Sequence, residues 1–394
     1  MGMTILAYQR DTESVIERLR LLVVERLQDR IFARFETPSR ALQDYLREHP
    51  IGFCPYPDPV ERVAFWDALL SERSAIEDDS LPCAYLSELD QGLYGGLVGG
   101  EVEFLRGDNG WVSSMTRPIL RDWSELDRLI GEFLPMMKMA PWTGAEPDGR
   151  KNPWLRRYLH HLDALIEAAR GKFGLSHFIL IDGLNFAFEL VGATQTYLAL
   201  TERPDWVRQA IDFAFDLNVA IQETFFARVH LLEGGTCSNM IQWAPGRVVS
   251  ESVDPFHMTS VGYFERWGRQ NIERMFARFD GGVLHIHGNG RHLLDAVSTI
   301  KGLRAILLGD DRGYPPAFGV LPELKRRTGD VPLAVSVDFA HFTSALDQHI
   351  LPGGVFYHVT DAPDADTANR WMERVRGGSS VPAMPCGSGS TPKS

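Results

Sequence analysis

The sequence has few cysteines, no excess of positive charge and no long hydrophobic run. Its four cysteines, Cys54, Cys83, Cys237 and Cys386, lie far apart and include no CxxC pair, which argues against a disulfide framework and against a cysteine-rich zinc module. The 40 basic residues are scattered among 52 acidic ones, and a net charge of -12 argues against nucleic-acid binding. No apolar run approaches the roughly 18 residues of a membrane span, so we expect a cytoplasmic protein without membrane contact.

The size and composition are those of an ordinary globular protein. With 394 residues, of which 44% are hydrophobic and 23% charged, the chain is long enough for one large domain or two modest ones. Residues 377–394 are rich in Gly, Ser and Pro, and we expect this tail to be disordered. Neither a GxGxxG turn after an early strand nor a GxxxxGK[ST] segment occurs, so the sequence does not support a dinucleotide site or a P-loop.

Helix signals recur along the whole chain. Apolar residues from Val15 to Leu27 recur at helical spacing, which predicts an amphipathic first helix. Thr37-Pro38 and Asp58-Pro59 each have a capping residue followed by proline, the pattern of a helix start. A further long helix is predicted from Pro204 onward.

Short apolar runs lie between the predicted helices and end in glycine or a polar residue. These runs begin at positions 178, 283, 305, 333 and 354. Apolar strands that alternate with helices indicate a parallel sheet covered on both faces, either a (β/α)8 barrel or a doubly wound sheet. Because nucleotide-binding motifs are missing, we predict an α/β fold of the (β/α)8 TIM-barrel type with an N-terminal helical extension. A barrel carries its chemistry at the carboxyl ends of its strands.

The segment from Val283 to Gly290 places two histidines at such a strand end. His285 and His287 are two residues apart, so on a strand their side chains point to the same side. Gly288 and Gly290 follow them and leave room for a ligand to approach the backbone. The pair suits a metal ion or an anionic substrate; alternatively, the histidines only form hydrogen bonds at the barrel mouth.

Several segments together resemble the uroporphyrinogen decarboxylase superfamily, which includes corrinoid- and coenzyme-M-linked methyltransferases. They are 78–82, 95–104, 183–200, 202–207, 254–257 and 285–289, the last of which resembles a His-x-Cys-Gly-Asn strand end. The resemblance implies three parts: an N-terminal helical extension (1–74), a barrel (75–376) and the tail (377–394). It also implies an enzyme that acts on a small-molecule substrate.

The sequence departs from the family in two ways. The decarboxylases carry an Arg-Gln-Ala-Gly-Arg segment that holds substrate carboxylates, and this chain has no such run. Because a substrate with many carboxylates needs several fixed guanidinium groups, uroporphyrinogen is a poor candidate substrate. The methyltransferases of the family have a zinc site that includes two cysteines. In the resemblance, His287 of this chain stands at the position of the first cysteine.

The resemblance leads to a set of candidate residues. We predict His285, His287 and His358 as ligands of a zinc ion, with Asp310 and Asp338 as acceptors that orient the ligands. Asp78 or Asp79 is the candidate for the family's early catalytic aspartate, and we favour Asp79, although it could instead cap a turn before Pro82. The candidate substrate-binding residues are Asp182, Asp254 and Asn289.

Three functions remain open from the sequence. The first is methyl transfer from a small methylated substrate to a corrinoid protein or a thiol carrier, at a metal site. The second is decarboxylation of uroporphyrinogen or a related carboxylated ligand, without a cofactor. The third is ligand binding without catalysis. The first is favoured because the arginine segment is missing while metal-ligating residue types remain at the strand ends.

Overall fold

The computed structural model describes residues 6–144, 152–177 and 179–377. The α-helices are α1 (Thr12–Val23), α2 (Arg40–Glu48), α3 (Pro59–Arg73), α4 (Gln91–Leu97), α5 (Leu126–Met137), α6 (Pro153–Ala169), α7 (Gly183–Val191), α8 (Ala193–Glu202), α9 (Pro204–Arg228), α10 (Val261–Trp267), α11 (Arg269–Arg278), α12 (Leu294–Val297), α13 (Leu321–Thr328), α14 (Phe339–Asp347) and α15 (Ala365–Gly377). The strands are β1 (Ile31–Phe35), β2 (Gly52–Cys54), β3 (Cys83–Tyr85), β4 (Val102–Arg106), β5 (Val112–Thr116), β6 (Gly174–Ser176), β7 (Leu180–Ile181), β8 (Gly235–Ser238), β9 (Gln242–Pro245), β10 (Val249–Ser252), β11 (Gly282–Ile286), β12 (Leu303–Leu308), β13 (Leu333–Asp338) and β14 (Val355–Thr360). Short 3-10 helices are η1 (Ser87–Leu89), η2 (Trp123–Glu125), η3 (Asp254–Met258), η4 (Gly288–Leu293) and η5 (Phe318–Val320). Apart from Gly377, the predicted tail lies outside the described residues, as does Cys386.

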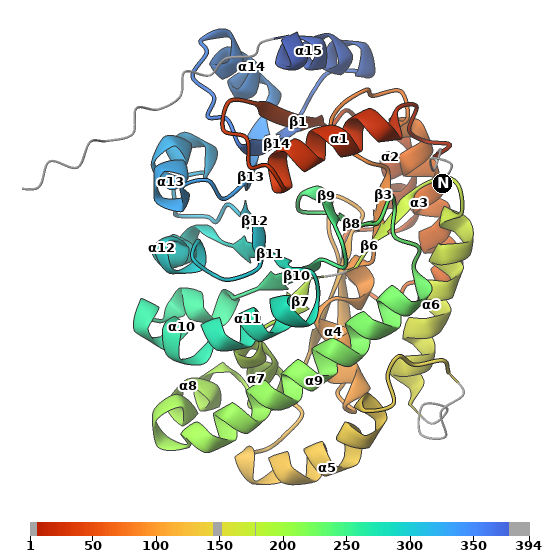
Figure 1. Cartoon of the computed structure of the whole chain (residues 1–394). Coiled ribbons are helices and arrows are strands. Elements are labelled where there is room, and N and C mark those ends of the chain that lie inside the picture. Colours follow the sequence, from red (N-terminus) through yellow and green to blue (C-terminus); the bar gives the residue numbers. More distant parts are fainter. Residues whose placement is uncertain (1–5, 145–151, 178, 378–394) are drawn as a thin grey trace, which may run out of the picture.

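A seven-stranded parallel sheet forms the centre of the fold (Figure 1). Its strand order is β1-β14-β13-β12-β11-β10-β7, and each neighbouring pair is parallel. The apolar runs recognised in the sequence form β7, β11, β12, β13 and β14 of this sheet. The expected parallel α/β fold is therefore confirmed.

The hydrogen-bonded ladders of the described residues do not close into a complete eight-stranded barrel. β3 and β6 form a separate parallel pair, and β6 is followed in the chain by β7. Just before β3, the backbone N–H of Asp79 donates to the carbonyl of Ala33 in β1 at 3.0 Å. That the strands close into a (β/α)8 barrel therefore remains a prediction.

The N-terminal region contributes directly to the central sheet. β1 pairs with β14 from Ile31 opposite Val355 to Phe35 opposite Val359. The structure therefore differs from the predicted helical extension over residues 1–74. The sequence signal was weak because β1 has only five residues and Arg34 interrupts its apolar pattern.

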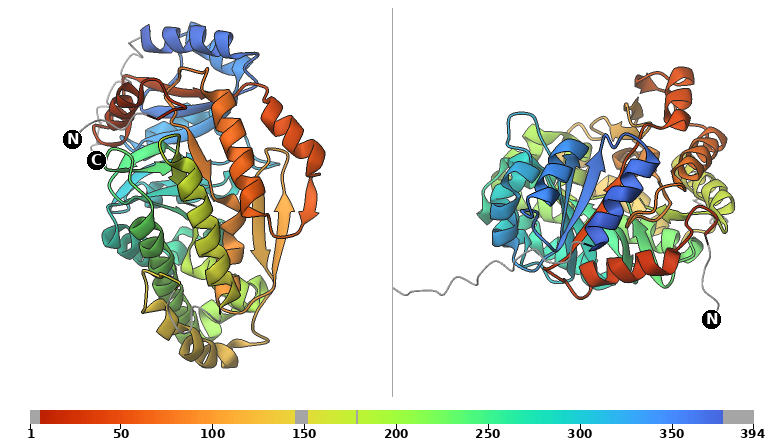
Figure 2. Two further views of the ribbon diagram at one scale, coloured as in Figure 1. Left: turned by 90° about the vertical axis from the view of Figure 1, so that its right-hand side faces the viewer. Right: turned by 90° about the horizontal axis from the view of Figure 1, so that it is seen from above.

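An antiparallel sheet and its helices occupy one flank of the molecule, coloured orange in the left view of Figure 2. Its strand order is β2-β4-β5. Asp58 caps α3 as predicted, since its carboxylate accepts a hydrogen bond from the N–H of Val60 at 2.7 Å. The cap of α2 is Ser39 instead of the predicted Thr37, and its hydroxyl accepts from the N–H of Leu42 at 3.1 Å.

A hydrophobic cluster covers part of one face of the central sheet. It joins α1 and the β8–β9 hairpin, including Trp243, to strand residues such as Val283 of β11 and Phe356 of β14. Val283 and His285 lie on the same face of β11 because they are two residues apart. The histidines therefore lie beyond this cluster, toward the carboxyl ends of the strands.

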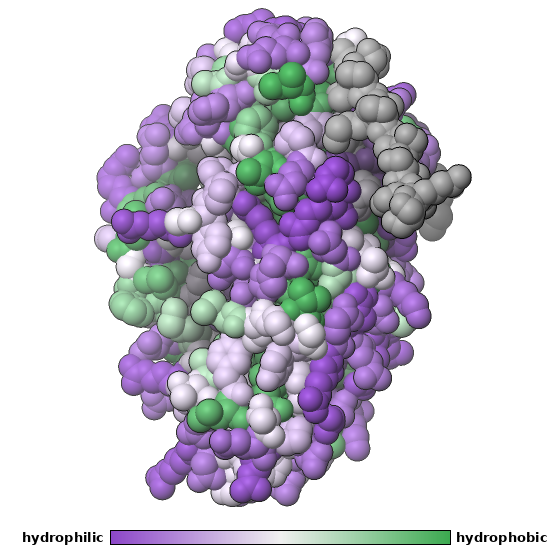
Figure 3. All heavy atoms as spheres, turned by 90° about the vertical axis from the view of Figure 1, so that its left-hand side faces the viewer, coloured by the Kyte–Doolittle hydropathy of each residue, from purple (hydrophilic) through white to green (hydrophobic). Residues whose placement is uncertain are grey.

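Hydrophobic and hydrophilic residues are mixed on the molecular surface on the side where α10, α12 and α13 lie. Figure 3 shows hydrophobic residues there as separate areas among hydrophilic ones. Within the described ranges, no helix has both the length and the apolar character needed to cross a membrane.

Candidate functional site

His285 and His287 lie side by side where β11 ends. The centroids of their rings are 4.3 Å apart. Gly309, which directly follows β12, makes this arrangement possible, because a Cβ at that position would lie 2.8 Å from Nε2 of His285 and 3.3 Å from Nδ1 of His287. The two imidazoles thus rest against the backbone of the neighbouring strand.

Asp254 joins the two histidines from the end of β10. Ser252 pairs with His285 in the β10–β11 ladder, so the residue two positions later comes level with His287. Ligand atoms of Asp254, His285 and His287 all lie within 4.8 Å of one another. Oδ1 of Asp254 lies 3.8 Å from Nε2 of His287 and is buried, with no hydrogen-bond partner among the described residues. The sequence predicted Asp254 as a substrate ligand, and the structure groups its carboxylate with both histidines in an arrangement that could hold a metal ion.

Asp311 orients the ring of His287. Its Oδ1 lies 2.9 Å from Nδ1 of His287, and its Oδ2 accepts from the N–H of Asn289 at 3.2 Å. Because an ionised carboxylate only accepts, Nδ1 carries a hydrogen, which leaves Nε2, the atom nearer Asp254, as the nitrogen that can act as a metal ligand. Burial acts to raise the pKa of Asp311, but the N–H of Asn289 and the imidazole of His287 lower it overall.

The structure brings neither Asp310 nor Asp338 to these histidines. Asp310 accepts from the N–H of Ala317 at 2.6 Å and pairs with Arg291 at 3.2 Å. Asp338 caps α14 and accepts from the backbone and ring nitrogens of His341. The predicted orienting role at Asp310 is met one residue later, by Asp311.

His358 also lies apart from the other two histidines. It is on β14, which β12 and β13 separate from β11 in the sheet. Its Nε2 lies 3.2 Å from the carbonyl of Met240, and Arg34 is its register partner on β1. The structure therefore does not bring the predicted three-histidine set together, and Asp254 takes the third position.

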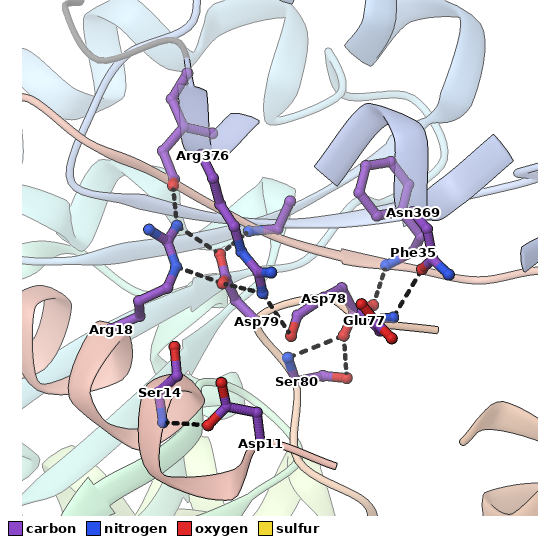
Figure 4. A network of polar contacts seen from close by, with 12 residues as sticks. Asp11, Ser14, Arg18, Phe35, Glu77, Asp78, Asp79, Ser80, Asn369 and Arg376 are labelled. Atoms are coloured by element: carbon purple, nitrogen blue, oxygen red, sulfur yellow. Dashed lines mark hydrogen bonds and ion pairs between the residues drawn. The ribbon is translucent and has the colours of Figure 1, made fainter. Parts of the chain in front are cut away.

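Asp79 lies in a network that joins α1, β1 and α15 (Figure 4). Its carboxylate pairs with Arg18 at 2.5 Å and accepts from the N–H of Ala33 at 3.2 Å, while Arg376 lies 3.6 Å away. The side chain is fully buried. These contacts tie α1 and α15 to the edge of β1 that does not pair with β14.

Asp182 and Asn289, the other predicted substrate ligands, lie at strand ends close to the histidine site. Asp182 caps α7 and accepts from the N–H groups of Leu184 and Asn185 through Oδ1, while Oδ2 is buried and has no partner among the described residues. Burial raises the pKa of Asp182 to about 7, and the charge of Asp254 adds to this shift. The side-chain oxygen of Asn289 is likewise buried and unpartnered within the described ranges.

Sequence reasoning missed His257 and Asp90, which the structure places near Asp254. Nδ1 of His257 lies 3.7 Å from Oδ1 of Asp254, and Gly290 allows the close approach, since a Cβ there would lie 2.1 Å from Cδ2 of His257. Burial lowers the pKa values of His257 and His285 to about 4, which favours neutral imidazoles. Burial raises the pKa of Asp90 to about 7, and Asp254 contributes to the shift. The segment 254–257 was noticed in the sequence, but only Asp254 was given a role.

With this geometry established, the chain can be compared with known proteins. Among solved structures it is similar to a methyltransferase from Methanosarcina mazei, with a TM-score of 0.55 and 14% sequence identity. The match covers 91% of this chain and 97% of that chain. At this identity the likeness shows the fold alone. A scan against protein-family models and a search of curated proteins give no match.

Proposed function

We propose that this chain is a metal-dependent enzyme of a (β/α)8-barrel type. It transfers a methyl group from a small methylated substrate to a corrinoid protein or a thiol carrier. The observation that carries the proposal is the convergence of Asp254, His285 and His287 at neighbouring strand ends. The methyltransferase with a similar fold is consistent with it.

The residues present fit a divalent metal ion. Two imidazoles and a carboxylate are a common ligand set for zinc and other first-row metals. The buried, unpartnered Oδ1 of Asp254 and the lone pair of His287 Nε2 supply two of the three ligand atoms. Zinc bound there would supply Lewis-acid activation of a thiol or water ligand. Asp311 would keep the ring of His287 in place, and the neutral state of His285 leaves it free to act as a ligand.

The other two functions have less support. Decarboxylation without a cofactor depends on Asp79, whose carboxylate is engaged by Arg18 and by the backbone of Ala33. Ligand binding without catalysis leaves the convergence of three metal-ligating groups without a role. Metal-dependent methyl transfer is therefore the function that we propose.

Metal analysis and a methyl-transfer assay together test the proposal. We expect protein purified without chelator to retain about one zinc per chain, and His287→Ala and Asp254→Ala to lose most of it. His358→Ala is the matched control and should retain the metal. For activity, methylcobalamin and a small thiol serve as probes, with demethylation followed by absorbance. Full metal content in both ligand variants would reject the site, and metal binding without methyl transfer to or from cobalamin would reject the reaction.

A further inference from the structure

A cavity lies beside the end of β1, and its lining includes none of the residues of the histidine site. Its volume is about 270 Å³, close to the lower end of the ~300–1,000 Å³ that is typical of small-molecule pockets. Arg34 of β1, Trp66 of α3, Tyr85 of β3 and Asn239 between β8 and β9 contribute to its wall. None of Asp254, His285 and His287 lines it.

Arg34 lines this cavity and has a hydrogen-bond donor without a partner in the described part of the chain. Its Nε is buried and has no hydrogen-bond partner among the described residues, and its terminal nitrogen is 3.5 Å from Glu36. The other arginine in the wall, Arg73, is engaged: it donates to the carbonyl of Phe35, to Asp78 and to Ser80. A buried guanidinium donor without a partner costs free energy unless a ligand or a water molecule accepts from it.

The remaining wall favours a flat, largely apolar ligand. Trp66, Tyr85 and Trp111 present aromatic surfaces to the cavity. Polar side chains also line it, among them Asn109, Gln242 and Asn239, and the side-chain oxygen of Asn239 is buried and unpartnered in the part of the chain that the structure describes. Glu36 and Glu72 also line the cavity and would repel a dianion such as phosphate.

We propose that this cavity binds a small carboxylate with a flat apolar body, and that Arg34 pairs with the carboxylate. Planar guanidinium and carboxylate groups match in a two-point hydrogen bond, and a monoanion meets less repulsion from Glu36 and Glu72 than a dianion does. The ligand's apolar body lies against the aromatic walls. This site is independent of the proposed metal-dependent reaction.

Calorimetric titration with benzoate, phenylacetate and indole-3-acetate tests the proposal. We expect at least one of these carboxylates to bind with a Kd of about 1 mM or tighter, and its neutral amide to bind at least ~10-fold more weakly. Arg34→Met should weaken carboxylate binding to a similar extent. Arg30→Met, which alters an exposed residue just before β1, and His285→Ala, which alters the metal site, should leave it unchanged.

Three results would overturn the proposal: no binding of any of the three carboxylates up to about 10 mM, equal binding of acid and amide, or unchanged affinity in Arg34→Met. The comparison of acid with amide uses the unaltered protein, so it holds even if Arg34→Met folds poorly. Failure of metal binding at Asp254, His285 and His287 would not affect these results, so the two proposals can fail separately.

Discussion

Asp311 fixes the ring of His287 through a hydrogen bond of 2.9 Å from Nδ1 to the carboxylate. The same carboxylate holds the backbone of Asn289. One side chain just after β12 therefore sets both the tautomer of His287, the candidate metal ligand just after β11, and the course of the turn that follows it. Such partners commonly influence metal affinity without touching the metal.

Asp311→Ala should weaken metal binding while leaving the three ligands in place. Loss of the partner frees the ring of His287 to rotate and to change tautomer, and we expect the zinc affinity to fall by about 10- to 100-fold. Competition with a chromogenic chelator measures this. Asp338→Ala is the control, because Asp338 pairs with His341 and not with the ligands. Equal affinities in Asp311→Ala and the unaltered protein would contradict the role assigned to Asp311.

Gly309→Ala should disturb the same site sterically. The added Cβ would lie 2.8 Å from Nε2 of His285 and 3.3 Å from Nδ1 of His287, so at least one ring must move. We expect metal content to drop, although the change adds only one methyl group. Gly319→Ala is the matched control, since nothing lies within 4 Å of a Cβ there. If Gly309→Ala retains full metal content and affinity, the two rings do not bind metal in the positions described.

The sequence predicted the elements of the sheet better than the way they meet. Apolar runs that end in glycine or a polar residue predicted β11 to β14. The two-residue spacing predicted that His285 and His287 lie on one face. Which strand lies beside β11 depends on pairing between segments far apart in the chain, and spacing along one segment carries no information about it. His358 was therefore grouped with residues that lie three strands away.

The sequence also could not predict which side chains contact one another at the strand ends. Asp310 and Asp311 are neighbours in the chain, and only the path of the backbone after β12 decides which one faces His287. Asp254 reaches the histidines because Ser252 pairs with His285, a register that the sequence does not state. The sequence therefore indicated the segment with the two histidines, but not which acidic residues lie beside them.

Arg18→Met should destabilise the fold, because it leaves the fully buried carboxylate of Asp79 without its main partner. Breaking a buried ion pair in this way typically costs about 3 kcal/mol of unfolding free energy. Urea denaturation measures the change. Arg10→Met is the control, since the Arg10–Glu77 pair is exposed on both sides and should contribute little. A stability equal to that of the unaltered protein would show that Asp79 does not depend on Arg18.

Glu189→Gln should make the stability of the protein less sensitive to a rise in pH from about 5 to about 8. Burial raises the pKa of Glu189 from 4.5 to about 8, so the folded state holds its proton more tightly than the unfolded state does. The stability from this group is fully present below about pH 4.5 and is lost as the pH rises through about 8. A glutamine keeps the size of the side chain and cannot ionise.

Urea unfolding at about pH 5 and about pH 8 checks this expectation. The unaltered protein should lose more unfolding free energy between the two pH values than Glu189→Gln does. Other buried groups also contribute over this range: the raised pKa values of Asp90 and Asp182, about 7, add to the loss, whereas the lowered pKa values of His257 and His285, about 4, oppose it. The test therefore depends on the difference between the unaltered protein and the variant. Glu101→Gln, at an exposed position, should behave like the unaltered protein. If Glu189→Gln and the unaltered protein lose the same free energy over this range, Glu189 is not protonated in the folded state at neutral pH.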